Sequence, residues 1–372
     1  MKIAIRSSAS GAASPLLRAL LLGTLVVVIA ASGLGCPGVK NCYVQTNLVS
    51  DTPLLASSTD ADLVNGWGVA FSPTSFAWVA NNGTHTSTVY DGLGAVQSLR
   101  VNIPAATLSG PSRPTGIVAN TTASFVIADG IYSTPAPALF LFASEDGGIS
   151  GWNPTVNADN AILAAFDATD SPQYTGLAIG SNDEGDFLFA ADFANGEVDV
   201  FDGDFLPVPT AAAFVDTLIP SDYAPFGIAC FDELVYVSYA QQDETGVDVV
   251  DGEGKGYISV FSMDGALMQR FVQNTGLNAP WGMAIAPANF GRFSGKLLVS
   301  NYGDGTISAY KTATGAYRGQ MRTESNGLLT IDGLRGIAFG NGAHDQPTST
   351  LYFAAGPSDE ANGLFGSIEV CP

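Results

Sequence analysis

The chain has 372 residues, of which 46% are hydrophobic and 13% are charged, a composition typical of a folded protein and not of a disordered one. Acidic residues outnumber basic ones by 35 to 14, and the formal net charge is −21. Such a field repels nucleic acid and anionic membrane surfaces, which argues against both as partners. It favours solubility and is compatible with bound cations.

Residues 1–35 have the features of an export signal, so we place them outside the fold. An apolar run at residues 19–31 follows three basic residues and is too short to span a membrane. The phrase Gly33-Leu34-Gly35-Cys36 resembles a bacterial lipobox, although Gly33 stands where that pattern prefers Leu. Two outcomes stay open, acylation of Cys36 or ordinary cleavage near Ala31. Residues 36–41 are then a short linker before a domain at 42–372.

A unit of about fifty residues recurs along this domain. Each copy has a Gly followed by an apolar residue, at Gly68, Gly116, Gly176, Gly227, Gly282 and Gly336. Each also has a second short apolar run, ending at Asn81, Asp129, Asp192, Tyr239, Asn301 and Ala355. Runs this short, bounded by turn residues, indicate β-strands. Repeats of this length built from short strands predict an all-β protein, a six-bladed β-propeller.

Three blades carry interruptions. The second has a Pro-rich turn at residues 133–137, where other blades have a simple Gly turn. The fourth has an acidic, Gly-rich insertion at residues 241–256, and the sixth has a loop at residues 356–366. In the third blade, residues 187–201 resemble an NHL-type repeat, in which one strand ends on Asp and an Asn-Gly turn leads to the next.

The two ends of the chain are predicted to meet. Residues 43–49 indicate a strand without a partner nearby, while the last repeat stops after a third strand at residues 366–370. Completing the sixth blade with the N-terminal strand would remove an exposed sheet edge. Because Cys42 begins one of these strands and Cys371 ends the other, we predict a disulfide between them in an oxidising compartment. Cys230 lies in a predicted innermost strand as a buried thiol.

Several phrases together resemble an uncharacterised family of exported bacterial propellers. They are Gln45-Thr-Asn-Leu-Val-Ser-Asp51, Asn65-Gly-Trp-Gly68, Tyr239-Ala-Gln-Gln-Asp243, Pro280-Trp-Gly282, Ile331-Asp-Gly-Leu334 and Gly356-Pro-Ser-Asp-Glu360. The resemblance covers residues 43 to about 370 and implies the architecture, but no reaction. Some members of that family end in a Pro-Glu-Pro sorting tail. The end of this sequence lacks one, which fits anchoring through an N-terminal lipid.

The loops at one end of the central channel are the candidate ligand site. The loop entering each innermost strand carries aromatic or basic residues, namely Trp67, Arg113, Tyr174, Phe226, Trp281 and Arg335, and Tyr239 joins them from the second strands. Aromatic surfaces give contact area while a few charges orient a guest. The alternative is that the aromatic residues pack between blades. Arginines near a channel are costly unless they meet an anion or a carboxylate.

Calcium is the candidate cofactor, at either of two places. Asn81, Asp129, Asp192 and Asn301 offer oxygen ligands at the channel, as in six-bladed lactonases, although no Glu occurs in these columns. The alternative is that these residues cap turns. In the fourth-blade insertion the acidic residues are Asp243, Glu244, Asp248, Asp251 and Glu253, without the spacing of an EF-hand. A flexible acidic loop is the alternative there.

The sequence favours binding over catalysis. His85 and His344 fall in predicted loops, and no nucleophile elbow, zinc spacing or phosphate loop is evident. We therefore predict an exported, lipid-anchored or extracellular monomer that binds a small or extended ligand or an envelope protein. A calcium-dependent, lactonase-like hydrolase and a purely structural envelope protein are the alternatives.

Overall fold

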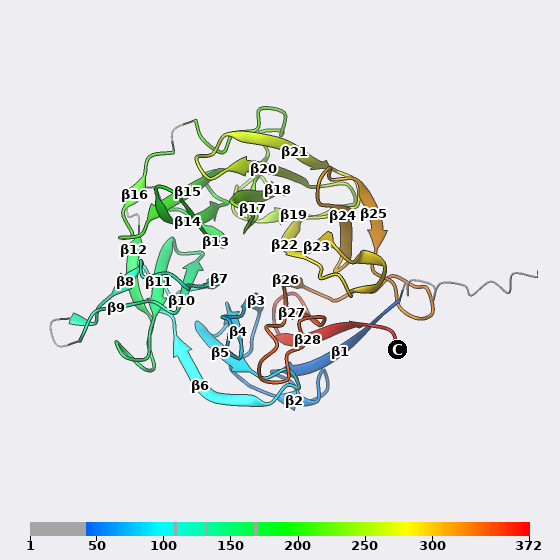
Figure 1. Ribbon diagram of the computed structural model, residues 1–372, viewed down its shortest axis with the longest axis horizontal. Helices are drawn as coiled ribbons and strands as arrows, with labels where there is room; N and C mark the ends of the chain where they lie inside the picture. The colour runs from blue at the N-terminus through cyan, green and yellow to red at the C-terminus, as the bar shows by residue number, and fades with distance from the viewer. Residues whose placement is uncertain (1–41, 108–109, 131–132, 167–169, 211) are drawn as a thin grey trace, which may run out of the picture. The chain divides into compact units, whose positions relative to one another are not determined.

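The computed structural model describes residues 42–372 except 108–109, 131–132, 167–169 and 211, and these residues belong to one compact unit. The predicted signal and Cys36 lie outside the described residues. Six sheets, antiparallel except for one outermost pair in the sixth, surround a central axis, which confirms the six-bladed β-propeller (Figure 1). A short 3-10 turn at Gly291–Phe293 (η2) lies among the described residues. No helix there is long and apolar enough to cross a membrane.

The first three blades follow the chain from the axis outward. Blade one contains β3 (Gly66–Ala70), β4 (Ala77–Asn81), β5 (Thr86–Tyr90) and β6 (Val96–Asn102). Blade two contains β7 (Pro114–Ala119), β10 (Phe140–Ser144), β11 (Gly148–Trp152) and β12 (Ile162–Phe166). Blade three contains β13 (Tyr174–Asn182), β14 (Gly185–Asp192), β15 (Glu197–Asp202) and β16 (Pro207–Val208).

The other three blades complete the ring. Blade four contains β17 (Tyr223–Phe231), β18 (Leu234–Gln242), β20 (Tyr257–Ser262) and β21 (Leu267–Gln273), with β19 (Val249–Val250) paired to β18. Blade five contains β22 (Pro280–Ile285), β23 (Lys296–Asn301), β24 (Ile307–Lys311) and β25 (Tyr317–Gln320). Blade six contains β26 (Leu334–Phe339), β27 (Leu351–Ala355), β28 (Leu364–Val370), β1 (Tyr43–Ser50) and β2 (Ser58–Thr59).

The six repeated glycines allow the innermost strands to approach one another. A Cβ placed on Gly227 would lie 2.0 Å from the carbonyl oxygen of Trp281 in the next blade, and one on Gly336 would lie 2.4 Å from that of Trp67. The other four glycines of the column also face the backbone of the following blade. A side chain at these positions would push two blades apart, so close backbone packing explains why the repeat contains Gly.

Hydroxyl groups join four of the seams between blades. Thr115 and Thr175 donate from their Oγ1 atoms to the carbonyl oxygens of Tyr174 and Phe226, at 2.6 and 2.9 Å. Ser238 and Ser300 donate from Oγ to the carbonyl oxygens of Pro280 and Arg335, at 2.8 and 2.5 Å. All four hydroxyls are buried. Each satisfies a carbonyl that the neighbouring blade could not pair within its own sheet.

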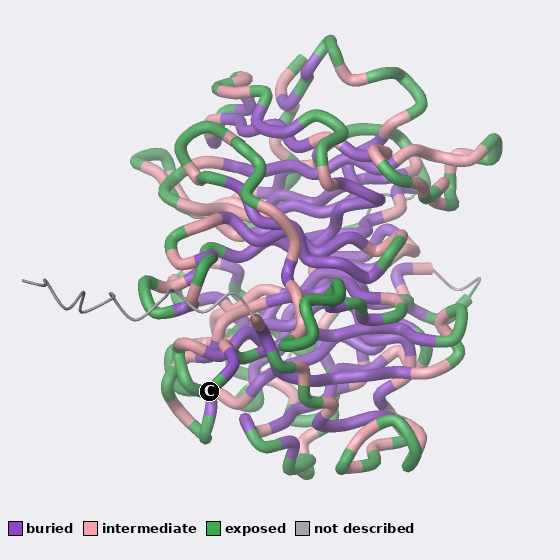
Figure 2. Tube along the Cα trace, turned by 90° about the vertical axis from the view of Figure 1, so that its right-hand side faces the viewer, coloured by how far each residue is buried: buried purple, intermediate pink, exposed green. Residues whose placement is uncertain are grey.

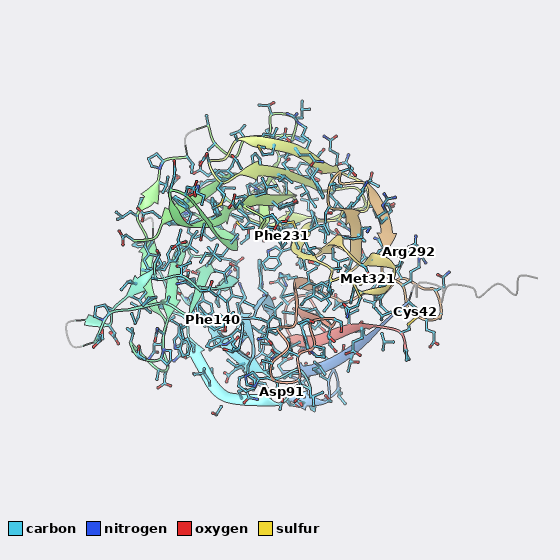
Figure 3. All side chains as sticks on the ribbon, viewed as in Figure 1. Cys42, Asp91, Phe140, Phe231, Arg292 and Met321 are labelled. Carbon is cyan, nitrogen blue, oxygen red and sulfur yellow. A yellow bond between two sulfur atoms is a disulfide. The ribbon has the colours of Figure 1, made fainter. Side chains whose placement is uncertain are left out.

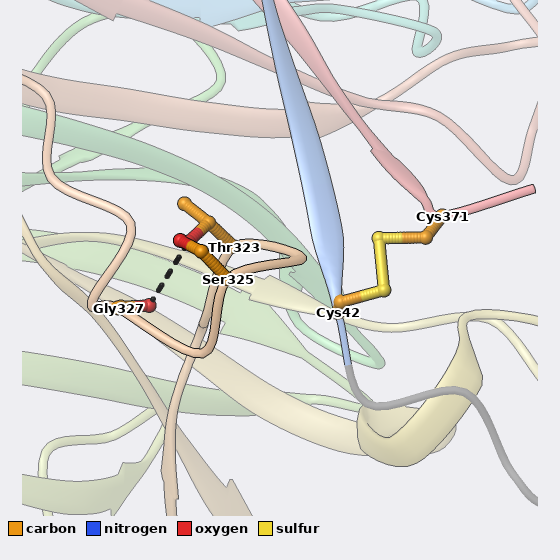
Figure 4. The surroundings of a disulfide bond; sticks show 5 residues. All are labelled: Cys42, Thr323, Ser325, Gly327 and Cys371. Atoms are coloured by element: carbon orange, nitrogen blue, oxygen red, sulfur yellow. Dashed lines mark hydrogen bonds between the residues drawn. A yellow bond between two sulfur atoms is a disulfide. The ribbon is translucent and has the colours of Figure 1, made fainter.

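The ends of the chain meet in blade six, as predicted. β1 pairs antiparallel with β28, from Tyr43 opposite Val370 to Ser50 opposite Leu364. Cys42 and Cys371 form a disulfide beside this pairing, with their Cα atoms 5.5 Å apart (Figure 4). Figure 3 places Cys42 at the outer margin of the ring. The predicted closure is thus confirmed, and the short strand β2 lies beyond β1 as an addition to it.

The predicted second strand of blade two is wrong. Val126–Ile127 (β8) pairs with Ala136–Pro137 (β9) in a separate hairpin, and β10 takes the place beside β7. The physical reason is burial: the whole of β10 is buried, whereas Val126 is exposed. An extra hairpin also explains why this repeat has the longest interval. Around the ring the inner strands are largely buried, whereas outermost strands such as β6, β12 and β25 are partly exposed; Figure 2 shows the buried chain in the interior and exposed loops around it.

Candidate functional site

At one end of the channel, each blade has two adjacent residues near the end of its second strand. One is buried within the sheets, and the next lies at the mouth of the channel. The first is the residue paired with the start of the innermost strand: Asn81, Ser144, Asp192, Tyr239, Asn301 and Ala355. We call this set the inward column, because all six residues are buried. The second is the residue that follows: Asn82, Glu145, Phe193, Ala240, Tyr302 and Gly356. We call it the mouth column, because four of its members line a cavity there.

This mouth cavity has a volume of about 630 Å³ and receives side chains from all six blades. The mouth column supplies Asn82, Glu145, Phe193 and Tyr302; the loops and innermost strands supply Trp67, Arg113, Gln173, Thr175, Phe226 and Arg335; longer loops supply Val247, Asp248, Val249 and Glu360. The mixture of apolar rings and a few charged groups is typical of ligand sites. Its volume is sufficient for a small organic molecule.

Arg335 is the central cation of the site. It is 1% exposed, and its Cζ lies 4.1 Å from the ring centre of Trp67 and 4.4 Å from that of Tyr302. Its guanidinium pairs with Glu360 and donates to Asn65 Oδ1 at 3.0 Å. The predicted requirement for a carboxylate near this arginine is therefore met by Glu360. The pair and the two rings fix the guanidinium in place, since each contact restricts its plane.

The loop that carries Glu360 is held in an unusual conformation. Ser358, Asp359 and Glu360 have φ values of 61°, 53° and 67°, three consecutive left-handed residues without a glycine. Tyr302 donates to Glu360 Oε1 at 3.1 Å, and Asn65 donates to Oε2 at 2.9 Å. Backbone in this region costs free energy and is concentrated at functional sites. The loop therefore holds this carboxylate at the mouth at some cost in stability.

Glu145 is the second carboxylate of the cavity, and its side chain is 17% exposed. Asn82 Nδ2 donates to its Oε2 at 3.0 Å, and Gln173 Nε2 donates to its Oε1 at 3.3 Å. Arg113 is 4.0 Å away and 63% exposed, so it partners this carboxylate only loosely. Burial raises the pKa of Glu145, an effect that the hydrogen bond from Asn82 and the charge of Arg113 oppose.

An aromatic layer closes the channel beneath the cavity. The ring of Trp67 meets those of Phe226 and Trp281 edge to face, at centroid distances of 6.3 and 5.9 Å. Trp281 Nε1 donates to the carbonyl oxygen of Thr175 at 2.8 Å, across from blade five to blade three. On the other side, Trp281 lines a second cavity of about 310 Å³, which the innermost strands enclose. Trp281 thus lies under the mouth cavity and not in it.

Four of the predicted ligand residues line the mouth cavity: Trp67, Arg113, Phe226 and Arg335. Tyr174 and Tyr239 do not, so their placement at the mouth was wrong. Tyr174 is in a hydrophobic core of blades two and three and donates to Asp199 Oδ2 at 2.7 Å. Tyr239 is in the core of blades three and four. Both occupy positions whose side chains point between blades, where aromatic packing is more favourable.

The four predicted calcium ligands are not brought together. Asp129 lies on the exposed β8–β9 hairpin region and accepts from Asn157 Nδ2 at 2.6 Å. Asn81 donates to Thr86 and Thr88, and Asn301 to Gly276, Thr306 and Ser308. Asp192 accepts from the backbone of Gln173 and from Asn195, and burial raises its pKa. Three of the four therefore hold turns together, the alternative role that their residue types allowed.

The predicted acidic loop divides between two roles. Asp243 accepts hydrogen bonds from Thr245, Gly246 and the Asp248 backbone, which fix a turn. The bond from the Thr245 hydroxyl, with those from the Asp248 and Thr245 backbone, lowers the pKa of Asp243. Asp248 lines the mouth cavity, and Asp251 lines an adjoining one. Glu244 and Glu253 are exposed. Across the described residues, no group of three or more His, Cys, Asp and Glu side chains could hold a metal ion, and calcium binding stays a prediction.

The histidines and the free cysteine lie outside the mouth cavity. His85 and His344 are in loops, as predicted, and His344 stacks on Phe76 at 3.7 Å. Cys230 lines the second cavity from the innermost strand of blade four. Burial raises its thiol pKa to about 12, so it is an unreactive side chain at neutral pH.

Sequence reasoning missed nine lining residues: Asn82, Glu145, Gln173, Thr175, Phe193, Val247, Val249, Tyr302 and Glu360. A signal existed for four of them, because each follows the end of a second strand by one residue. Side chains alternate along a strand, so the residue after an inward one faces the opposite way. For Glu145 this signal also required the correct second strand of blade two. Glu360 lies in an irregular loop and has no periodic signal.

Comparison with known proteins gives relatives in sequence and neighbours in fold. No family model matches the chain. Uncharacterized protein R648 of Acanthamoeba polyphaga mimivirus is 35% identical over 328 residues, which cover 86% of this chain and 78% of that protein. Uncharacterized protein L690 of the same virus is also 35% identical over 328 residues, covering 86% of this chain and 84% of that protein. The expected likeness to exported bacterial propellers and to NHL repeats stays a prediction.

Solved structures match the chain at low sequence identity. Virginiamycin B lyase from Staphylococcus aureus has a TM-score of 0.48 and 13% identity, covering 88% of this chain and 99% of that chain. A glucose dehydrogenase also has a TM-score of 0.48 and 13% identity, covering 87% of this chain and 98% of that chain. Likeness of this degree concerns architecture alone.

Proposed function

The chain belongs to the family of the mimivirus proteins R648 and L690, and we propose that it is an exported propeller that binds an organic ligand in the mouth cavity without converting it. The observation that carries this proposal is the cavity itself. It holds about 630 Å³ above a closed aromatic layer, and it gathers rings, amides and charges from all six blades. A purely structural propeller has no need of such a convergence.

Three lining side chains support binding because they have atoms without partners. Trp67 Nε1, Gln173 Oε1 and Arg335 Nε are buried and make no hydrogen bond within the described structure. An unpaired buried donor or acceptor costs about 1–3 kcal/mol, so native proteins rarely leave one without a reason. A ligand or an ordered water in the mouth cavity would supply the missing partner to one or more of them.

The chemistry of the lining favours binding over turnover. Among the described residues that line the cavity there is no Ser, Cys or His, and the one Thr hydroxyl is occupied by the carbonyl of Phe226. A hydrolase remains the second candidate because of one observation. Burial raises the pKa of Glu145, which is a property of general acids in enzymes.

Export and lipid anchoring are part of the same proposal. The support is the signal-like segment at residues 1–35, the phrase ending at Cys36, and a disulfide of the kind that persists in oxidising compartments. Labelling of producing cells with a clickable palmitate analogue should tag the wild-type protein and not Cys36→Ser. Equal labelling of the two proteins would contradict acylation at this cysteine.

A cavity-filling variant tests binding. Gln173 lines the cavity and is half-buried, so an indole there in Gln173→Trp should occupy the space of a guest. Gln97→Trp, on the outermost strand of blade one, is the matched control. In a thermal-shift panel of amines, saccharides and organic acids, we expect a ligand that stabilises the wild type and the control but not Gln173→Trp.

Mass spectrometry of the recovered ligand separates the two candidates. Binding predicts an unchanged mass after prolonged incubation with the wild type. A product of hydrolysis that disappears in Glu145→Gln would favour the hydrolase. Equal stabilisation of Gln173→Trp and the control would place the ligand elsewhere and contradict the proposal.

A further inference from the structure

The mouth cavity is the middle of a longer trough. Toward blades five and six it shares Val249, Tyr302 and Glu360 with a neighbouring cavity of about 260 Å³. Toward blades two and three it shares Arg113, Glu145, Gln173 and Val247 with another of about 360 Å³. Shared lining residues place the three spaces next to one another along the mouth. A guest that reaches more than one of them is therefore extended.

This trough is strongly acidic. Its described lining includes Glu145 and six further carboxylates, against only the two guanidinium groups of Arg113 and Arg335: Asp146, Asp248, Asp251, Asp332, Asp359 and Glu360. Arg335 is already paired with Glu360 and lies between two rings, so its charge is not available to an anionic guest. A concave acidic surface on a chain of net charge −21 attracts cations and repels anions.

The centre of the trough offers specific contacts as well as charge. Gln173 Oε1 is a buried acceptor without a donor, and it lies on the same side chain that donates to Glu145. Arg113, 4.0 Å from Glu145, is too far for a hydrogen bond to that carboxylate. An ammonium group carries three donors and no acceptor, so it could donate to Gln173 Oε1 and to the carboxylate of Glu145 at once.

Aromatic rings adjoin this point. Phe193 and Phe226 line the cavity, with ring centres 5.4 Å apart, and Phe226 meets Tyr302 at 6.2 Å. A ligand cation is attracted to the faces of such rings, and the methylene groups beside it pack on them. The buried Trp67, whose Nε1 has no partner, offers a donor to a carbonyl oxygen of a peptide guest, whereas a polyamine has no oxygen to accept it.

We propose that the trough binds a chain of protonated amines, with one ammonium group between Glu145 and Gln173 and the rest along the carboxylates toward blades five and six. The inference rests on the proposed function and specifies its ligand class. Two sources carry this chemistry, a free polyamine or a lysine-rich peptide segment. Trough length and acidity favour both over a single inorganic cation, for which the described residues offer no grouped ligands.

Calorimetric titration with spermidine tests the proposal on the full chain at low ionic strength. Wild-type protein should bind with a stoichiometry near one, and added salt should weaken the binding. Glu145→Gln keeps the shape of the side chain and removes its charge. Because a hydrogen bond to a charged group contributes about 1.5–3 kcal/mol, we expect at least a tenfold loss of affinity.

A matched pair of double variants separates the trough from general charge. Asp251→Asn with Asp359→Asn removes two exposed carboxylates from one end of the trough, and should weaken spermidine binding roughly three- to tenfold. Asp183→Asn with Glu184→Gln removes the same charge from the β13–β14 turn, outside the lining of the trough, and should change affinity less than about twofold.

The outcomes are separable. Tight hexalysine binding with weak spermidine binding would identify a peptide as the source, and the reverse would identify a free polyamine. No saturable heat with either probe, equal losses in the two double variants, or stoichiometric displacement of spermidine by calcium would overturn the amine proposal. In that case, a neutral ligand from the thermal-shift panel that binds the wild type but not Gln173→Trp would still support the proposed binding function, without the amine proposal.

Discussion

The inward column and the mouth column differ by a single step along the chain, yet the molecule uses them for different purposes. Asn301 is fully buried, and its amide joins three partners within its own blade and the loop before it. Tyr302, the next residue, faces the cavity and contacts Arg335 and Glu360 from other blades. Asn81 and Asn82 differ in the same way: Asn81 donates to Thr86 in its own blade, whereas Asn82 donates to Glu145 in the next blade.

This difference teaches how a repeat can carry both a fold and a site. Alternation along a strand gives every blade one residue that faces its own sheet and one that faces the common axis. The first is enclosed within the sheets, and where it is Asn or Asp its side chain makes hydrogen bonds to its own blade and the loop before it. The second is shared among blades, so it can vary from Asn to Glu, Phe or Tyr. Variation at the mouth column is therefore the feature to test.

The largest expected effect is on stability, from the inward column. Asn301→Ala would leave the backbone N–H of Asn278 and the carbonyl of Gly276 with fewer partners. We expect the free energy of unfolding to fall by about 3 kcal/mol, measured by urea denaturation, with spermidine affinity unchanged in the folded protein. Tyr302→Phe is the control, and it should cost about 1 kcal/mol or less. If both variants lost the same free energy of unfolding, the inward and mouth columns would not differ in their contribution to stability.

Arg335→Met should change both the free energy of unfolding and the affinity for spermidine. The variant removes the guanidinium from between Trp67 and Tyr302 and leaves Glu360 without its ion pair. Because Glu360 is 41% exposed and can be rehydrated, we expect a loss of about 2 kcal/mol, less than for a fully buried pair. Denaturation would measure it. Arg335→Lys, which keeps the charge, should recover part of the loss; no recovery would assign the role to shape alone.

Asn82→Ala should have a smaller effect, of about 1 kcal/mol. It removes the donor to Glu145 Oε2 and the acceptor of Asn65 Nδ2. Because the hydrogen bond from Asn82 lowers the pKa of Glu145, its loss should raise that pKa further, which titration by NMR would detect. An unchanged pKa would show that Gln173 and solvent hold this carboxylate without Asn82.

The sequence predicted the architecture well because the architecture depends on repeated constraints. Gly227 and Gly336 recur for a steric reason that every seam shares, and Cys42 and Cys371 occupy strand ends that closure brings together. The site was harder to predict because it depends on direction and on exceptions. Asn301 has the chemistry of a ligand but faces inward, and Glu145 follows a strand that an extra hairpin displaces along the chain.

Glu360 illustrates what the sequence could not reveal. It reaches the cavity through three successive left-handed residues in a loop, a conformation with no propensity signal in Ser358-Asp359-Glu360. Its partner Arg335 was recognised as needing a carboxylate, but the choice among 35 acidic residues required the folded chain.

The central claim is that Glu145 serves to bind a ligand and does not stabilise the fold at neutral pH. Glu145→Gln tests this claim most directly, because it should weaken binding without lowering the free energy of unfolding at that pH. Folding raises the pKa of Glu145 above its ordinary value of 4.5, so the group stabilises the native state at low pH and that contribution is lost as the pH rises through the raised pKa. At pH 7 the variant should be at least as stable as the wild type, an advantage that shrinks toward pH 4.5.

The measurement is urea denaturation of both proteins at pH 7, with and without spermidine. A ligand that binds only the folded state adds stability in proportion to the logarithm of one plus the ratio of its concentration to the dissociation constant, about 2.7 kcal/mol at one hundred times that constant. Our account predicts that this concentration of spermidine stabilises the wild type by about 2.7 kcal/mol and Glu145→Gln, which binds at least tenfold more weakly, by about 1.4 kcal/mol or less. A variant that is less stable than the wild type, yet is stabilised equally by spermidine, would contradict it.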